Sequence, residues 1–336
     1  MRKFIAWTVL GAATLARAQG APDVVWQEPT PSLLANSVMG VSYSPLGNFV
    51  MVGSTDRWLR ERRADLDTLV YSVLEPQHSR GVRQITHSID GRLLGVQNQS
   101  TGLGFRVQRA SDGAFLGSIT ATVGQNGIVT FAPDSMLRAN TGDSGTLWRW
   151  RFSDLTQFRV TGSGYEQVTT TFNFSPNGVY QTASSGGSIT VQRRSDGAVI
   201  TALNGGSLVV FSPDSRLLAT WTATPHNEIV LYRTSDWTAV QWLQSPASND
   251  GVAALRFTPD STRIVSTGYH PFLDADGLWQ QQGIIRFWSV SDGAVLRTYD
   301  HGTDLAVTSP VAWSPDGTRF LYGLYNGTVA VATTPH

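Results

Sequence analysis

The sequence has no cysteine, so disulfides, thiolate nucleophiles, cysteine-based zinc sites and lipoprotein anchoring are all excluded. Lysine is almost as scarce, because Lys3 is the only lysine in 336 residues. Lys3 lies in a segment that we expect to be removed, which excludes Schiff-base chemistry and a lysine general base from the mature chain. Any binding or catalysis by the mature chain would therefore depend on histidine, carboxylate and aromatic side chains.

The N-terminal segment has the features of a secretory signal peptide. Arg2 and Lys3 form the charged region, residues 4–15 form an apolar core, and Ala16-Arg17-Ala18 matches a cleavage site. A membrane anchor is the alternative, but the apolar run is shorter than the ~20 residues that span a bilayer. We therefore expect residues 1–18 to be a signal peptide and residues 19–336 to form a single domain. The mature protein would be periplasmic or secreted, with no membrane insertion.

Cleavage near Ala18 would also change the charge of the protein. It removes three of the 25 basic residues, so 22 remain against 25 acidic residues. A mildly acidic chain without a basic run is poorly suited to nucleic acid or to anionic membranes, so we expect neither as a partner. The oligomeric state does not follow from the sequence.

A short turn motif recurs along the chain and defines a repeat. Two clear copies are Phe174-Ser-Pro-Asn-Gly178 and Trp313-Ser-Pro-Asp-Gly317. Proline presets φ in such a turn, Ser and Asp can cap backbone groups, and Gly closes it. The seven copies begin at Tyr43, His87, Phe131, Phe174, Phe211, Phe257 and Trp313. Their third residues are separated by 44, 44, 43, 37, 46 and 56 positions, and a period in the forties is typical of propeller blades.

A second turn marker predicts four strands in each repeat. It separates the third strand from the fourth, as in Ser195-Asp196-Gly197, and it recurs in most copies. The seventh copy has no fourth strand after its third strand at residues 328–332, whereas Asp23–Gln27 is a strand-like piece without a repeat of its own. We therefore predict an all-β, seven-bladed β-propeller of four-stranded antiparallel blades. The N-terminal strand would join the last blade and close the ring, which would leave no exposed sheet edge there.

The repeats resemble degenerate WD40 repeats of the bacterial exported type, over about residues 22–336. The Phe-Ser-Pro-Asp-Gly-type turn and the third-strand aromatics Trp150, Tyr232 and Trp288 carry the resemblance, although no copy has a clear Gly-His dipeptide. The resemblance implies a scaffold that binds a protein or an extracellular polymer through its loop face. The alternative is a propeller hydrolase of the lactonase type, with carboxylates, with or without calcium, at the channel mouth.

The loops expected on one face contain several histidines and acidic residues. Four of the six histidines lie there, namely His78, His226, His270 and His301. The acidic residues there are Asp56, Asp143, Glu166, Glu228, Asp250, Asp274, Asp276, Asp300 and Asp304. Such a set could bind a divalent cation or act in acid–base chemistry. The other explanation is that polar residues collect in loops in any case.

The sixth repeat departs most from the period, because Tyr269–Gly283 is inserted before its third strand. Asp274-Ala-Asp276-Gly277 matches the start of a calcium loop, but the closing glutamate is absent. The apolar residues nearby suggest a partner-contact lip or a lid; folding back onto the blade is the alternative. We assign no catalytic residue, no metal ligand and no required cofactor. The candidate binding residues are His226, His270, Phe272, Asp274, Asp276, Trp279 and His301.

Arginines cluster in the first repeat, at positions 57, 60, 62 and 63, and they alternate with acidic residues. Side chains of opposite charge at this spacing can pair with one another along a strand. We predict a solvated strand face that is partly paired with itself, rather than a phosphate or nucleic-acid site.

Overall fold

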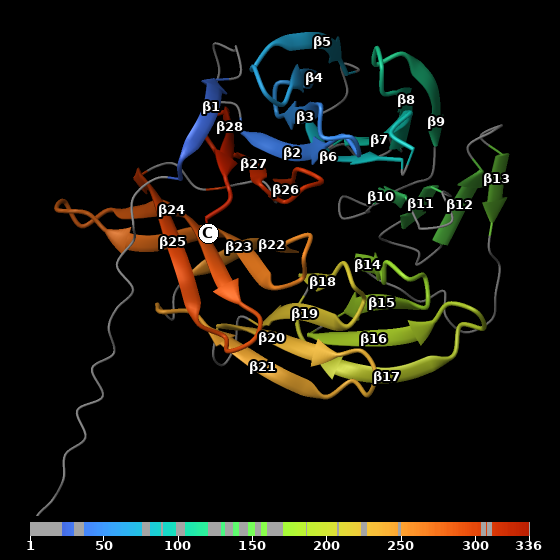
Figure 1. Cartoon of the computed structure of the whole chain (residues 1–336), viewed down its shortest axis with the longest axis vertical. Coiled ribbons are helices and arrows are strands. Elements are labelled where there is room, and N and C mark those ends of the chain that lie inside the picture. Colours follow the sequence, from blue (N-terminus) through green and yellow to red (C-terminus); the bar gives the residue numbers. More distant parts are fainter. Residues whose placement is uncertain are drawn as a thin grey trace, which may run out of the picture.

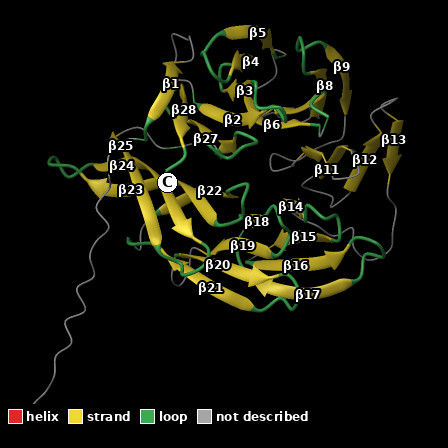
Figure 2. Cartoon of the chain, viewed as in Figure 1, coloured by secondary structure: helices red, strands yellow, loops and turns green. Residues whose placement is uncertain are grey.

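The computed structural model describes residues 22–29, 37–75, 81–88, 90–98, 105–119, 129–131, 137–140, 147–151, 156–159, 171–185, 187–206, 208–222, 227–247, 250–303, 307 and 311–335. The expected signal peptide, His78 and His226 lie outside these residues. All the elements in the described part are β-strands, as Figure 2 shows. No helix capable of crossing a bilayer is found in that part.

The strands form seven antiparallel sheets of four strands each. The first sheet contains β2 (Val38–Tyr43), β3 (Phe49–Ser54), β4 (Trp58–Arg63) and β5 (Leu69–Leu74). The second contains β6 (Val82–His87), β7 (Leu93–Asn98), β8 (Phe105–Arg109) and β9 (Phe115–Ile119). The third contains β10 (Val129–Phe131), β11 (Leu137–Asn140), β12 (Leu147–Arg151) and β13 (Thr156–Arg159).

The next three sheets repeat this order. The fourth contains β14 (Thr171–Phe174), β15 (Tyr180–Ser185), β16 (Ser188–Arg193) and β17 (Val199–Asn204). The fifth contains β18 (Val209–Phe211), β19 (Leu217–Thr222), β20 (Glu228–Arg233) and β21 (Ala239–Gln244). The sixth contains β22 (Gly251–Phe257), β23 (Arg263–Leu273), β24 (Trp279–Ser289) and β25 (Val295–Thr303). Figure 1 shows the sheets around a common centre, with the first strand of each sheet innermost.

The seventh sheet combines the two ends of the described chain. It contains β26 (Ala312–Trp313), β27 (Arg319–Gly323), β28 (Thr328–Thr333) and β1 (Val24–Pro29). β1 pairs antiparallel with β28, which is the position that the sequence assigns to the N-terminal piece. Its Trp26 Nε1 donates to the Ala64 carbonyl of the first sheet at 3.0 Å. The first and seventh sheets therefore share contacts through a strand from the start of the chain.

The turn after the first strand has the chemistry that its sequence predicts. In the seventh sheet, Ser314 Oγ donates to Asp316 Oδ1 at 2.6 Å and accepts from the Arg319 N–H at 2.9 Å. Gly317 closes this turn with a φ of 70°. Ser215 takes the glycine position of its own turn with a φ of 62°, a conformation that is unfavourable for a residue with a Cβ. Its hydroxyl accepts from the Asn177 N–H of the neighbouring sheet at 2.9 Å, which helps to offset this strain.

The arginine cluster in the first sheet corrects one of the predictions from the sequence. Arg60 and Arg62 are buried rather than solvated, with relative exposures of 4% and 8%. Arg60 pairs with Asp56 at 2.6 Å, and Arg62 pairs with Asp67 at 2.6 Å. Alternation on a strand indicates which residues share a face, but it does not show which face a neighbouring sheet covers. Only Arg63 fits the solvated description, because its pair with Asp65 is about half exposed.

Candidate functional site

The insertion of the sixth repeat is a continuation of two strands rather than a loop. β23 and β24 are 11 residues each, and their pairing runs from Arg263↔Ser289 to Leu273↔Trp279. β22 accompanies β23 only as far as Tyr269. On the other side, β25 accompanies β24 only as far as Gln282, so the last three residue pairs, from Pro271↔Gln281 onward, form a two-stranded projection that Figure 1 shows leaving the ring of sheets. We call residues 269–283 the long hairpin.

The turn of the long hairpin is organised by the Asp274 carboxylate. Oδ1 accepts from the N–H groups of Asp276 and Leu278 at 3.0 and 2.8 Å, and Oδ2 accepts from Gln280 Nε2 at 2.8 Å. These bonds, led by the one from Gln280, lower the pKa of Asp274. The carboxylate acts as a turn cap, whereas Asp276 is exposed. In the described part of the chain, no group of three or more histidine or acidic side chains is placed to hold a metal ion.

The tip of the long hairpin is apolar and open to solvent. Leu273, Leu278 and Trp279 have relative exposures of 54%, 62% and 71%. Phe272 is only partly exposed. These side chains are held on a paired ladder and a capped turn, so little conformational entropy would be lost when they bind a partner. The tip is therefore a preorganised apolar surface.

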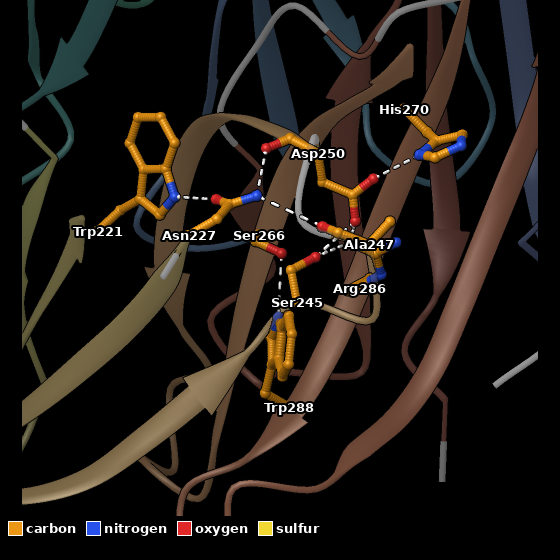
Figure 3. A network of polar contacts seen from close by, with 9 residues as sticks. All are labelled: Trp221, Asn227, Ser245, Ala247, Asp250, Ser266, His270, Arg286 and Trp288. Carbon is orange, nitrogen blue, oxygen red and sulfur yellow. Dashed lines mark hydrogen bonds and ion pairs between the residues drawn. The ribbon is translucent and has the colours of Figure 1, made fainter. Parts of the chain in front are cut away.

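A buried carboxylate lies at the base of the long hairpin (Figure 3). The Asp250 side chain has a relative exposure of 2% and follows the loop from the fifth sheet. Its Oδ2 is 2.5 Å from Arg286 Nη1 and accepts from Ser245 Oγ at 2.5 Å. Its Oδ1 is 2.7 Å from His270 Nδ1. We call Ser245, Asp250, His270 and Arg286 the Asp250 cluster.

The Asp250 cluster joins three segments that are separate in the sequence. Ser245 follows β21, His270 lies on the long hairpin, and Arg286 lies on β24. Asn227 Nδ2 donates to the backbone carbonyl of Asp250 at 2.8 Å, and Trp221 Nε1 donates to Asn227 Oδ1 at 2.8 Å. The network therefore ties the base of the long hairpin to the fifth sheet.

The geometry of the cluster favours a structural role over a catalytic one. Nucleophilic catalysis by serine needs the hydroxyl and a general base in direct contact. Here Ser245 Oγ donates to Asp250 and accepts from Arg286, while His270 contacts the other carboxylate oxygen. Arg286 neutralises the buried carboxylate, as expected of a structural ion pair. The cluster positions the hairpin; it does not form a serine–histidine pair.

The structure brings together only some of the candidate residues. His270, Phe272, Asp274, Asp276 and Trp279 lie on the long hairpin. His301 is not on the long hairpin but on β25, which pairs with β24 as far as Gln282, and its ring centroid is 5.1 Å from that of Tyr322. Burial lowers the pKa of His301 to about 4, so this imidazole is neutral near pH 7. His226 lies outside the described residues.

Reasoning from the sequence named Asp250 but missed its partners Ser245 and Arg286. A signal for Arg286 was present, because Arg60, Arg106 and Arg286 each lie three residues before the end of a third strand. Each of them pairs with a buried carboxylate. Arg60 pairs with Asp56, and Arg106 Nη1 is 3.3 Å from Glu75 Oε2. An arginine at this repeat position thus predicts a buried acidic partner.

Comparisons with known proteins indicate the fold alone. No family model matches the chain, and no curated protein matches it either. The structure is similar to a chain in "Crystal Structure of Mitotic Checkpoint Complex", with a TM-score of 0.68 over 100% of both chains. The sequence identity in that match is 15%, which is too low to transfer a function. The antiparallel four-stranded sheets and this match identify the architecture as a WD40-like β-propeller.

Proposed function

We propose that the protein is an exported, seven-bladed propeller that serves as a scaffold and binds a protein or an extracellular polymer through the long hairpin. WD40-like propellers in general act as protein-binding scaffolds, which gives the broad class. The observation that carries the proposal is the exposed tip, where Leu273, Leu278 and Trp279 form an apolar surface on a rigid support. Clustered exposed apolar side chains, aromatic ones above all, favour recognition of a partner.

Ring closure is the structural part of this proposal. Beyond the β1–β28 pairing, the Val38 N–H donates to the Leu324 carbonyl at 3.2 Å. Val38, Val52, Leu321 and Val331 share one buried cluster between the first and seventh sheets. These contacts support a closed ring of seven blades in which β1 covers the free edge of β28. A closed ring would hold the long hairpin in a fixed position.

Export is the part of the proposal that rests on the sequence. A charged start, a short apolar core and Ala16-Arg17-Ala18 support cleavage before Gln19. We expect mass spectrometry of the protein from the exported fraction to give Gln19 as the first residue, and an Ala18→Leu variant to be retained uncleaved. An intact Met1 on the exported wild-type protein would contradict this part of the proposal.

The role of the hairpin is tested with two exposed tryptophans. Trp279 lies on the tip, whereas Trp242 lies on β21 at the rim of the fifth sheet with a relative exposure of 51%. We expect Trp279→Ser to weaken capture of a specific partner from the exported fraction at least about tenfold, as for an interface hot spot. Trp242→Ser serves as the matched control and should leave capture unchanged. Equal capture by both variants and wild type would contradict the assignment.

The hydrolase alternative has less support from the described residues. At the base of the hairpin, His270 contacts one carboxylate oxygen of Asp250, and Arg286 and Ser245 occupy the other oxygen. Asp274 is engaged by its own turn. Asp276 is the hairpin carboxylate that stays exposed, and calcium takes about 6–8 oxygen ligands, so Asp276 alone gives this alternative little support.

A further inference from the structure

One edge of β24 has no neighbouring strand where β24 runs through the long hairpin. β25 pairs with β24 only as far as Gln282, and no other described strand pairs with residues 279–281 on that side. Such an edge presents backbone N–H and C=O groups that can pair with another extended chain. The hairpin therefore offers hydrogen-bonding groups of the backbone in addition to its apolar tip.

The register of the long hairpin shows which backbone groups face this edge. The Asp274 N–H donates to the Leu278 carbonyl at 3.0 Å, so these two residues form a hydrogen-bonded pair. Hydrogen-bonded and non-hydrogen-bonded pairs alternate along an antiparallel ladder, so the next pair, Leu273↔Trp279, exchanges no backbone bonds. Gln281, two residues further along β24, is in the same position of the alternation. The N–H and C=O groups of Trp279 and Gln281 therefore point away from β23 and toward the unpaired edge.

The opposite edge of the hairpin is less able to accept a strand. By the same alternation, Pro271 and Leu273 are the residues of β23 whose backbone groups point outward. Proline has no N–H group, and a proline on an edge strand hinders pairing with another chain. The sequence of β24 has no proline from Trp279 to Gln282. The β24 edge is therefore the one that fits an added strand.

The charge along the β24 edge is negative. Asp274 and Asp276 lie at the turn, and the Asp300 carboxylate accepts from Gln282 Nε2 at the base of the edge. Residues 269–283 contain no arginine or lysine, and His270 contacts Asp250. These charges favour a partner that carries arginine or lysine, and they disfavour a second copy of the same acidic hairpin.

We propose that the partner of the long hairpin supplies an extended polypeptide segment that pairs with β24 as an additional strand. This inference rests on the proposed function and narrows its partner from a protein or polymer to a protein segment. Backbone hydrogen bonds to Trp279 and Gln281 hold the segment, as when a peptide adds to an exposed sheet edge. An apolar side chain of the segment lies beside Trp279, and an arginine or lysine lies near Asp276.

A library of short random peptides displayed on phage is the probe, selected against the chain of residues 19–336. We expect the selected peptides to combine apolar residues with arginine or lysine, and their synthetic copies to bind in calorimetry. Gln281→Pro removes an outward N–H without breaking a bond within the hairpin, and it should weaken binding about tenfold or more. Ala275→Pro is the control and should leave binding unchanged. It adds a proline to the same hairpin at the second position of the turn at residues 274–277, which favours proline.

Hydrogen exchange measured by NMR tests the same geometry on the wild-type protein, without any variant. A selected peptide that adds a strand should slow the exchange of the Trp279 and Gln281 amides, because both become hydrogen-bonded. The Leu273 amide serves as the internal control. It points toward the opposite edge, so its exchange should be unaffected by the peptide.

The outcomes separate this inference from the proposed function. Peptides that require Trp279 but bind Gln281→Pro as tightly as wild type, with no slowing of the two amides, would overturn the added strand alone. Failure to select any peptide that depends on the hairpin, while Trp279→Ser still weakens capture of the partner, would do the same. Self-association that Gln281→Pro abolishes would identify a second copy of the chain as the occupant and overturn the assignment to a partner segment. Equal capture by Trp279→Ser and wild type would contradict the proposed function itself, and the inference would fall with it.

Discussion

Replacing Asp250 with alanine should lower the free energy of unfolding by about 3–5 kcal/mol, because it leaves Arg286 buried without a partner. The side chains of Asp250 and Arg286 have relative exposures of only 2% and 9%. The substitution also removes the acceptor of the Ser245 hydroxyl and the contact of His270. Urea denaturation of the two proteins measures the difference.

An exposed ion pair provides the control for the Asp250 experiment. Arg233 and Asp236 are 2.9 Å apart, and both side chains are about half exposed. Arg233→Met should therefore cost no more than about 1 kcal/mol. The double variant Asp250→Ala/Arg286→Met should be more stable than Asp250→Ala alone, because no unpaired charge remains. A loss below about 1 kcal/mol for Asp250→Ala would show that the cluster does not support the sixth sheet as described.

Starting the chain at Thr30 instead of Gln19 should lower the melting temperature by roughly 10 °C. This truncation removes β1 and, with it, the ladder to β28 and the bond from Trp26 to Ala64. Several backbone hydrogen bonds at about 1 kcal/mol each and the partial burial of Trp26 account for the effect. The exposed β28 edge should also promote association between molecules.

A shorter truncation is the control for the loss of β1. A chain that starts at Asp23 keeps the whole strand and should melt at the same temperature as a chain that starts at Gln19. Trp26→Ala should fall between the two truncations, because it keeps the ladder but loses the indole contact. An unchanged melting temperature for the chain that starts at Thr30 would contradict closure of the ring by β1.

The repeat was readable from the sequence because its turns use local chemistry. A Ser-Pro-Asp-Gly turn requires only residues close in sequence, and Ser314, Asp316 and Gly317 make the expected contacts within it. The same register predicted Tyr232 and Trp288 on third strands. Tyr232 lies in β20 and Trp288 lies in β24, which are the third strands of their sheets. Features set by short-range geometry could therefore be predicted.

The long hairpin was located by the sequence, but its conformation was not. The extra length of the sixth repeat marked residues 269–283, yet Pro271 and three consecutive glutamines concealed the strand pattern. Pro271 is tolerated because β22 ends its pairing at Tyr269, so that edge of β23 has no neighbouring strand in the sheet. Which edge is unpaired depends on the three-dimensional arrangement and cannot be read from spacing.

The Asp250 cluster illustrates what spacing cannot show. Ser245 and Arg286 are 41 positions apart, and only the packing of two sheets brings their side chains to 3.0 Å. Which side chains are buried, and which opposite charge from another sheet pairs with them, can be seen only in the structure.

Site-specific photo-crosslinking at position 279 is the most direct test of the central claim that the long hairpin contacts a partner. A photoreactive residue would replace Trp279 in one protein and Trp242 in another, since both side chains are exposed and both proteins should fold. After illumination in the exported fraction, we expect a discrete crosslinked product from position 279 and none of that mass from position 242. The same product from both positions, or no product from position 279, would contradict the claim.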